Sequence, residues 1–156
     1  MAMTDVEGNL RRHVGVLSAE IGDRTPLRPE KLARAADYVR AAFEASGFQV
    51  TVQDYDYHGL NVANIIAEAP GDPSAYYVIG AHYDVCGDQP GADDNASSVA
   101  GLLETARLFA ANQPELDYRV DFVAYCLEEP PFFGSDSMGS YVHAESLHEQ
   151  NVDVSG

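Results

Sequence analysis

The N-terminal third of the chain has apolar residues at helical spacing. In the first stretch they are separated by three or four positions, as in an amphipathic helix: Val6, Leu10, Val14 and Leu17. This pattern predicts a helix over residues 5–21. A loop containing glycine and proline follows. A second helix is predicted over residues 29–45, because Pro29 suits a first helical turn and Gly47 suits a C-cap.

Four shorter segments have the alternation or the composition of β-strands. Residues 48–57 and 61–68 alternate or cluster apolar side chains, and the turn residues 58–60 between them predict a hairpin. Residues 75–80 and 119–125 are nearly continuous apolar runs rich in β-branched and aromatic side chains. Runs of this length and composition are typical of buried strands.

Two further helices, predicted over residues 96–110 and 137–150, complete the order α-α-β-β-β-α-β-α. This order predicts an α/β fold in which one mixed sheet lies between helices on both faces, a three-layer α/β/α arrangement. The first two strands are expected to be antiparallel, and the helix over residues 96–110 to make the later two parallel. With 156 residues and 46% hydrophobic content, residues 1–156 are expected to form a single domain.

The chain is strongly acidic, with 25 Asp and Glu residues against 9 Lys and Arg residues and a formal net charge of −16. Such a field repels phosphate, so neither nucleic acid nor an anionic membrane is expected as a partner. No apolar run is long enough to cross a bilayer, and residues 1–7 lack the features of a signal peptide. A cytoplasmic location is therefore expected. Cys86 and Cys126 are too few for a disulfide framework and are expected to be free thiols.

Polar residues with ligand chemistry gather where two predicted strands end. His82 and Asp84 follow the third strand, and Asp94 comes just before the next helix. Glu128 and Glu129 follow the fourth strand. In an open α/β sheet, ligands bind outside the carboxyl ends of the strands. One imidazole and several carboxylates form a mixed nitrogen and oxygen ligand set, which suits zinc, manganese or cobalt.

Each of these residues also has a simpler interpretation. A lone histidine at a strand end is usually a surface or capping residue, and the acidic residues around Asp94 would suit the N-terminus of a helix. Glu128 and Glu129 would suit a solvated loop, but like charges at a buried strand end are costly unless a cation compensates them. Cys86, which follows the His-x-Asp motif closely, is expected to be a thiol that binds no metal.

A family resemblance is carried by residues 81–97, which have the sequence AHYDVCGDQPGADDNAS, and by the Glu-Glu pair. The pattern resembles the peptidase family 28 metallopeptidases, the co-catalytic zinc aminopeptidases. That family has a His-x-Asp motif, a Gly-x-Asp/Asn-Asp-Asn/Asp-x-Ser loop and a Glu-Glu pair in this order and at about this spacing. Gly134-Ser135 and residues 61–67 are also similar, so the resemblance covers most of the chain. It implies a zinc-peptidase-like fold, also described as phosphorylase/hydrolase-like.

The resemblance implies a role for each residue of the motif. His82 would bind one metal ion, Asp94 would bridge two, and Glu129 would bind the other. Glu128 would be the general base, and Asp84 would accept the remaining ring N–H of His82, which fixes the tautomer. The family also implies that the peptide bond after Asp94 is cis.

The implied activity is hydrolysis of the peptide bond next to a free amino terminus, with a peptide or a small aminoacyl compound as substrate. The cofactors would be two zinc ions, for which cobalt or manganese can substitute. Two alternatives remain open: a glutaminyl-cyclase-like acyltransferase with one zinc, and a non-catalytic module of the same fold. A metal content of two, one or no zinc equivalents would distinguish the three.

In the resembling family each metal takes a further protein ligand from downstream, so the chain resembles the N-terminal half of a catalytic domain. Asp153 lies too early to be that ligand, and His143 and His148 are expected to be ordinary polar residues of the last helix. The domain is therefore expected to be truncated, and the chain alone to bind metal weakly and have little activity. An exposed sheet edge is expected to favour self-association.

Overall fold

The structure, a computed structural model, describes residues 5–71 and 75–154. The described residues form a mixed sheet whose strands are β1 (Gln49–Tyr57), β2 (Leu60–Glu68), β3 (Tyr76–His82) and β4 (Arg119–Tyr125). Their order across the sheet is β1-β2-β4-β3. The β1–β2 hairpin and the β2–β4 pair are antiparallel. The β3–β4 pair is parallel, as the connecting helix predicts.

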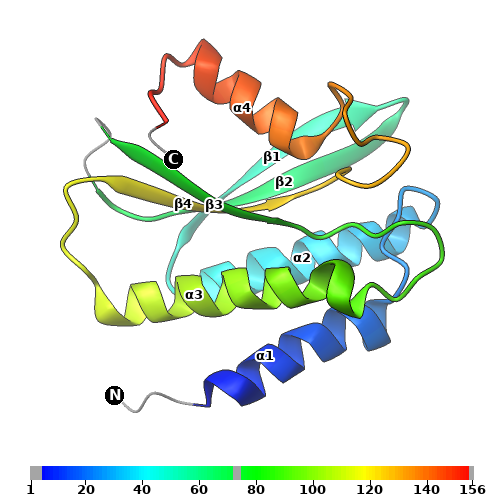
Figure 1. Cartoon of the computed structure of the whole chain (residues 1–156), viewed down its shortest axis with the longest axis horizontal. Helices are drawn as coiled ribbons and strands as arrows, with labels where there is room; N and C mark the ends of the chain where they lie inside the picture. Colours follow the sequence, from blue (N-terminus) through cyan, green and yellow to red (C-terminus); the bar gives the residue numbers. More distant parts are fainter. Residues whose placement is uncertain (1–4, 72–74, 155–156) are drawn as a thin grey trace.

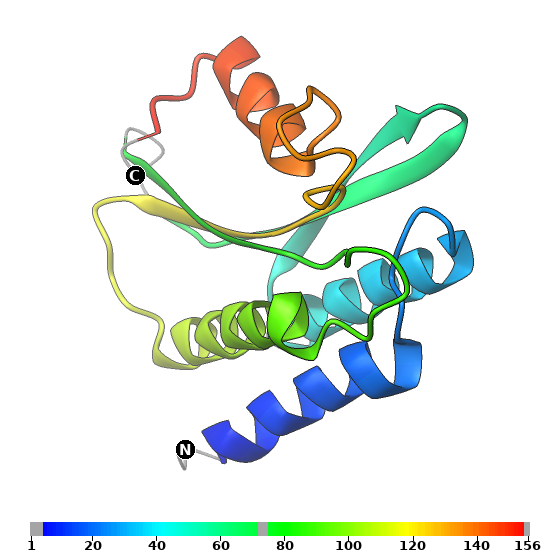
Figure 2. The same cartoon turned by 45° about the vertical axis from the view of Figure 1, so that its right-hand side comes forward.

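Helices cover both faces of this sheet (Figure 1). One face carries α1 (Val6–Gly15) with its π-helical continuation η1 (Val16–Ile21), α2 (Pro29–Ala45), and η2 (Ala92–Ser97) with α3 (Ser98–Asn112). The other face carries α4 (Gly139–Glu149), and the turned view in Figure 2 shows the same separation. The predicted three-layer α/β/α fold with a mixed sheet is confirmed.

The inner face of the sheet, which is the face toward α2 and α3, packs against these helices through an apolar core. The outer face is the one toward α4. Phe122 of β4 is fully buried, and its ring meets those of Phe48 and Phe109 edge to face, with centroids 5.6 and 5.5 Å away. Val39 and Phe43 of α2 are also fully buried. Removing a phenylalanine from such a core costs about 3–5 kcal/mol. This packing therefore holds β4, and with it the acidic residues that follow the strand, in a fixed place.

The outer face of the sheet is covered by α4, which buries one of its two histidines. His143 is 4% exposed, and its Nδ1 atom lies 3.3 Å from the hydroxyl of Tyr125. His148, on the same helix, is exposed. His143 is therefore a buried polar residue, because α4 lies along the sheet and turns that side of the helix toward β4, and it is not among the group of potential metal ligands found in the described residues.

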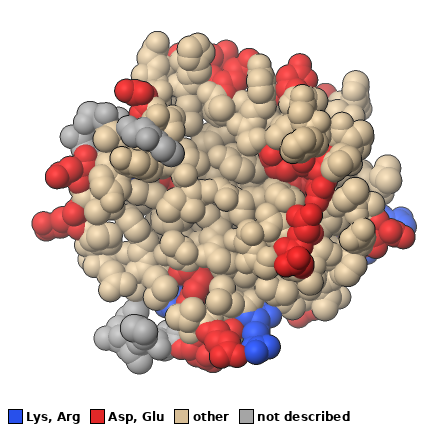
Figure 3. Space-filling model, in the orientation of Figure 1, with Lys and Arg blue, Asp and Glu red and all other residues tan. Residues whose placement is uncertain are grey.

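The surface is acidic, as the composition predicts. On the face drawn in Figure 3, Asp and Glu side chains occur around the whole outline and form a band down the right-hand side, whereas basic side chains are few. None of the helices in the described part of the chain has the length and apolar character needed to cross a membrane.

Candidate metal centre

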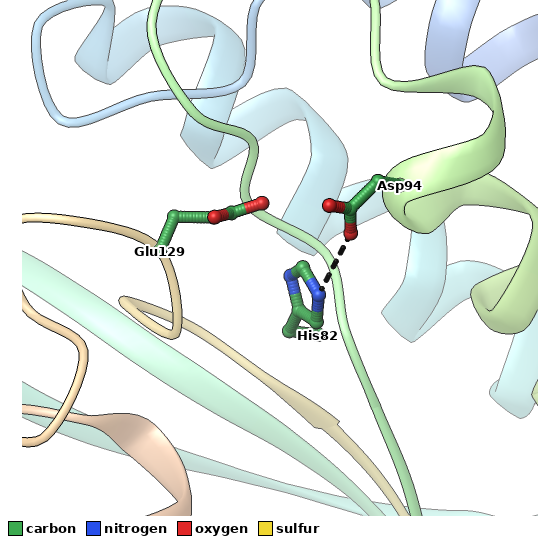
Figure 4. Close-up of side chains that lie close together, drawn as sticks. All are labelled: His82, Asp94 and Glu129. Carbon is green, nitrogen blue, oxygen red and sulfur yellow. Dashed lines mark ion pairs between the residues drawn. The ribbon is translucent and has the colours of Figure 1, made fainter.

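Three potential ligands come together at the carboxyl end of the parallel strand pair. His82 is the last residue of β3 and is paired with Tyr125, the last residue of β4, so the loop that carries Glu129 begins beside it. Asp94 approaches from η2, the irregular turn that precedes α3. One ligand atom from each of His82, Asp94 and Glu129 lies within 4.8 Å of the other two. Figure 4 shows Glu129 and Asp94 pointing toward each other above the imidazole. We call these three residues the His82 cluster.

The distances and exposure within the His82 cluster suit a metal ion reached from solvent. The Nε2 atom of His82 lies 3.2 Å from Oδ1 of Asp94. The imidazole is 21% exposed and the Asp94 carboxylate 73% exposed, so one side of the cluster is open to water. A neutral imidazole nitrogen and two carboxylates are donors that zinc accepts. The residues present therefore fit a zinc ion.

The electrostatics of the cluster also favour a cation. Burial and the charge of Asp94 raise the pKa of Glu129 above its ordinary value. For His82, burial lowers the pKa, but the hydrogen bond and charge of Asp84 and the charges of Asp94 and Glu129 outweigh it and raise the pKa. An excess of negative charge around one imidazole contributes to both shifts, together with burial in the case of Glu129. A bound divalent cation would neutralise this excess.

Asp84 is a buried carboxylate that joins the two strand ends. It has no exposed surface, and its two oxygens accept hydrogen bonds from the backbone N–H groups of Glu128 and Glu129, each at 3.2 Å. The Nδ1 atom of His82 lies 3.5 Å from Asp84 Oδ1 and 3.3 Å from the Asp84 carbonyl oxygen. Asp84 therefore lies near the ring nitrogen of His82 that does not face Asp94, as the family resemblance implies. It also holds the backbone of the acidic pair, which sequence reasoning missed.

The two glutamates of the pair point in different directions. Glu129 belongs to the His82 cluster, whereas the Glu128 carboxylate accepts hydrogen bonds from the backbone N–H and the hydroxyl of Ser140, at 2.6 and 2.9 Å. Ser140 is the second residue of α4, so Glu128 lies at the N-terminal end of that helix. The structure therefore separates the pair, and it brings Ser140 into contact with the predicted general base. No spacing in the sequence signals this contact.

The segment around Asp94 is not a helix cap. Asp94 and Asn95 have non-helical dihedral angles inside η2, and the peptide bond between them is cis, as the family resemblance implies. The N-cap residue of α3 is Ser97, and none of the side chains makes a capping hydrogen bond there. The simpler interpretation of Asp94 as a capping residue is therefore wrong, and its carboxylate is directed to His82 instead.

The two cysteines lie outside this cluster and are free, as expected. Cys86 is exposed, and the group of potential metal ligands found in the described residues does not include it. Cys126 is fully buried, and burial, with the charge of Asp84, raises the pKa of its thiol far above the ordinary value. Cys126 is therefore a protonated core residue.

Comparisons with known proteins agree with this geometry. Residues 64–154 match the model of peptidase family M28. The uncharacterized protein YfbL of Escherichia coli strain K12 is 44% identical over 146 residues, which span 88% of this chain and 45% of YfbL. A protein of Pyrenophora tritici-repentis named "Probable zinc metalloprotease" is 38% identical over 89 residues, which span 51% of this chain and 20% of that protein. The chain therefore spans less than half the length of these two relatives.

Solved structures share the fold over nearly the whole chain. A leucine aminopeptidase precursor from Bacteroides thetaiotaomicron superposes with a TM-score of 0.74 at 24% identity, over 98% of this chain and 60% of that one. A glutaminyl cyclase from the same organism superposes with a TM-score of 0.73 at 24% identity, with the same two coverages, 98% and 60%. At this level of identity these likenesses establish the fold alone, which a peptidase and a cyclase have in common.

The family match includes the whole region that builds the candidate site, from the middle of β2 through η2 to the loop after β4. Zinc is the metal that the family and the named metalloprotease relative indicate. Because the match covers more than half of the chain, the chain belongs to peptidase family M28.

Proposed function

We propose that the protein is an aminopeptidase with a two-zinc site, which hydrolyses the peptide bond next to a free amino terminus. The observation that supports this proposal most directly is the convergence of His82, Asp94 and Glu129 within 4.8 Å at the carboxyl ends of parallel strands. His82 and Glu129 would each bind one ion, and Asp94 would bridge the two. Zinc, when bound, supplies a Lewis acid that polarises the scissile carbonyl and makes the attacking water more acidic.

Glu128 is the proposed general base. Its carboxylate would take a proton from the attacking water and pass it to the leaving amine. Ser140 donates one hydrogen bond to each oxygen of this carboxylate. Each carboxylate oxygen has two lone pairs, so one remains free on each oxygen to accept the proton. Ser140 would thus fix the orientation of the base, and Asp84 the backbone that carries it.

Two isosteric substitutions test the different roles of the acidic pair, in the full-length enzyme. Glu128→Gln should retain zinc and abolish turnover, because the amide keeps the shape and cannot take the proton. Glu129→Gln should lower zinc content as well, because it removes a ligand. Metal content is measured by elemental analysis and turnover with an aminoacyl-nitroanilide. Equal zinc content together with full activity in both variants would contradict the proposal.

The described residues provide few ligands for each of two ions. One would be held by His82 and Asp94 and the other by Asp94 and Glu129, whereas a catalytic zinc usually has about three protein ligands. We therefore expect the 156-residue chain by itself to bind zinc weakly and to hydrolyse the anilide slowly or not at all. Robust turnover by the purified chain with zinc or cobalt would contradict this part of the proposal.

A glutaminyl-cyclase activity is the second candidate, because the cyclase structure superposes on nearly the whole chain. It differs from the peptidase in zinc stoichiometry and in product. One zinc equivalent and cyclisation of an N-terminal glutaminyl peptide would support the cyclase, and two equivalents with release of the N-terminal residue would support the peptidase. A full-length protein without zinc and without either activity would be a non-catalytic module.

We also propose that the chain self-associates through the β3 edge, with a second copy of the chain as the partner. In the described residues, β3 has the neighbouring strand β4 on one side, and Val154 forms an isolated bridge to Tyr76. Tyr77 and Ile79 are 38% and 42% exposed on this edge strand. A lysine side chain on an edge strand discourages pairing with another chain, so Ile79→Lys should shift the sedimentation coefficient toward the monomer. Identical sedimentation of both proteins would contradict this proposal.

A further inference from the structure

Arg24 is a buried arginine whose guanidinium is surrounded by backbone carbonyl groups. Its side chain lies in the loop between η1 and α2, and it has no exposed surface. Five carbonyl oxygens accept hydrogen bonds from it, at 2.7–3.1 Å: those of Leu17, Gly22, Tyr83, Pro90 and Gly91. None of the carboxylates in the described residues forms an ion pair with it.

The carbonyls that Arg24 binds lie beside two members of the His82 cluster. Tyr83 directly follows His82, and its carbonyl accepts from Nε of Arg24 at 2.8 Å. Gly91 lies three positions before Asp94, and its carbonyl accepts from Nη2 at 3.1 Å. The same Gly91 carbonyl accepts the N–H of Ala96, on the far side of Asp94. One side chain therefore connects the end of β3 with the turn that presents Asp94.

Backbone contacts around Arg24 tighten this connection. The carbonyl of Arg24 accepts the N–H of Val85 at 3.1 Å, so the two loops are bonded in both directions. Gly91 has a φ of +58°, and a Cβ atom added there would lie nearest to Cγ1 of Val85, at 2.6 Å from the Asp94 carbonyl oxygen and 2.9 Å from Nη2 of Arg24. The turn before Asp94 is therefore packed directly against the guanidinium, with no space for a larger residue.

The charge of Arg24 is compensated at a distance by Asp84. Burial lowers the pKa of Arg24 to about 10, while the negative charge of Asp84 acts in the opposite direction, so the guanidinium remains protonated at neutral pH. A buried charge is costly, and an apolar side chain could fill the same space at lower cost. The guanidinium differs from other side chains in its planar array of five N–H donors, which can hold several carbonyls at fixed angles.

We propose that Arg24 is a positioning residue, which fixes His82 and Asp94 relative to each other before zinc binds. This inference rests on the proposed function, because it concerns the same site. The ligands of a metal site bind tightly when they are already held at the correct separation. His82 and Asp94 come from different segments, and Arg24 binds the backbone next to both.

The test uses Arg24→Lys, which keeps the charge but lacks the planar donor array, and Val39→Ala as a control. Val39 is fully buried in α2 and lies outside both ligand segments. Zinc affinity is measured by calorimetry on the full-length protein, and amide hydrogen exchange is measured at Val85, Ala96 and, as a reference, Val123 of β4. Both variants are first compared by circular dichroism and urea unfolding.

Arg24→Lys is expected to weaken zinc binding at least about tenfold, as loss of an outer partner of a metal site does. It should also accelerate exchange at Val85 and Ala96 about tenfold more than at Val123. Val39→Ala should accelerate all three amides by a similar factor and leave zinc affinity unchanged. Wild-type zinc affinity and wild-type exchange at Val85 and Ala96 in Arg24→Lys would overturn the proposal.

If Arg24→Lys does not fold, Arg24→Gln tests the same contacts, because it removes the buried charge and keeps only two of the five N–H donors. The expected and the contradicting results are the same as for Arg24→Lys. If the full-length wild-type protein binds no zinc, the proposed function fails. Exchange at Val85 and Ala96 then decides by itself whether Arg24 holds the two segments together.

Discussion

Two charged clusters lie at opposite ends of the same parallel strand pair, and they differ in how their negative charge is compensated. The His82 cluster lies at the carboxyl ends of β3 and β4. At the amino ends, where Tyr76 is paired with Arg119, lies a second cluster that we call the Arg119 cluster: Glu68, Tyr76, Arg119 and Asp121. Both contain two carboxylates, but only the second contains an arginine that binds them.

The carboxylates of the Arg119 cluster are paired with an arginine of the same cluster. The guanidinium of Arg119 donates to both oxygens of Asp121 at 2.9 Å and lies 3.1 Å from the carboxylate of Glu68. The hydroxyl of Tyr76 donates to Asp121, and Arg119 lies 5.2 Å from the centre of the Tyr76 ring. Asp121 is 1% exposed, so this paired carboxylate is buried with its partners. Both carboxylates of the Arg119 cluster therefore have a cationic partner within the protein.

The His82 cluster lacks such a partner. None of the Lys and Arg residues in the described ranges forms an ion pair with Asp94 or Glu129, and the nearby Arg24 donates its hydrogen bonds to carbonyl groups. The comparison teaches that a group of acidic residues in an acidic chain is not in itself a metal site. The difference lies in whether the protein supplies the cation or leaves that place to a metal.

Removing the arginine from the Arg119 cluster should have the largest effect on stability. Arg119→Met would leave the buried Asp121 carboxylate without its counter-charge, which typically costs about 3–5 kcal/mol. Zinc affinity should not change, because the Arg119 cluster lies at the other end of the strands. Urea unfolding and zinc titration of the same sample check both statements. A loss of zinc binding at unchanged stability would reverse the assignment of the two clusters.

Asp84→Asn should affect both stability and the His82 cluster. The amide keeps the shape of the side chain, but its NH₂ group replaces one of the two oxygens that accept hydrogen bonds from backbone N–H groups. One backbone N–H is then left without an acceptor, which costs about 1–3 kcal/mol. Zinc affinity should fall about tenfold or more. The matched control is Asp88→Asn, an exposed residue of the same loop. If the two variants behave alike, Asp84 does not organise the site.

In the metal-free chain, Glu129→Gln should not lower the unfolding free energy, in contrast to Arg119→Met. Burial and the neighbouring Asp94 disfavour the charged form of Glu129, so neutralising it should leave the unfolding free energy unchanged or raise it by up to about 1 kcal/mol. The measurement is urea unfolding in the presence of a chelator. A clear loss of stability would mean that Glu129 is already compensated within the protein, as Asp121 is.

The smallest expected effect is a pH dependence of stability that arises from His143, on the outer face of the sheet. Burial lowers the pKa of His143 below its ordinary value of 6.5. The unfolded chain therefore binds more protons than the folded chain in this range, and stability should fall as the pH decreases below about 6.5. His143→Gln should reduce this slope, whereas His148→Gln, at an exposed site on the same helix, should not. Equal slopes in both variants would contradict the role of His143.

The order of elements could be predicted from the sequence because its signals are local. Helical spacing, buried apolar runs and turn residues fix the three-layer fold, and the parallel strand pair then brings His82 next to the acidic pair. The motif resemblance identifies His82, Asp94 and Glu129, which the structure brings together. These parts depend on residue types at fixed spacings, which a sequence displays directly.

The remaining parts depend on contacts between distant segments. Arg24 binds carbonyl groups as far as 67 positions away, and every residue type carries a carbonyl, so no sequence pattern identifies the partners. The contact of Ser140 with Glu128 depends on where α4 begins, and the burial of His143 on how that helix lies on the sheet. These contacts are determined by how the elements pack, and the residue types alone do not reveal them.

The most direct test of the central claim is the position of zinc in a crystal of the protein grown with zinc. Anomalous scattering at the zinc absorption edge locates the ion independently of any assumed ligand. The account predicts a peak about 2.0–2.2 Å from Nε2 of His82 and from carboxylate oxygens of Asp94 or Glu129. An empty His82 cluster, with zinc at Cys86, at His148 or in the Arg119 cluster instead, would contradict it.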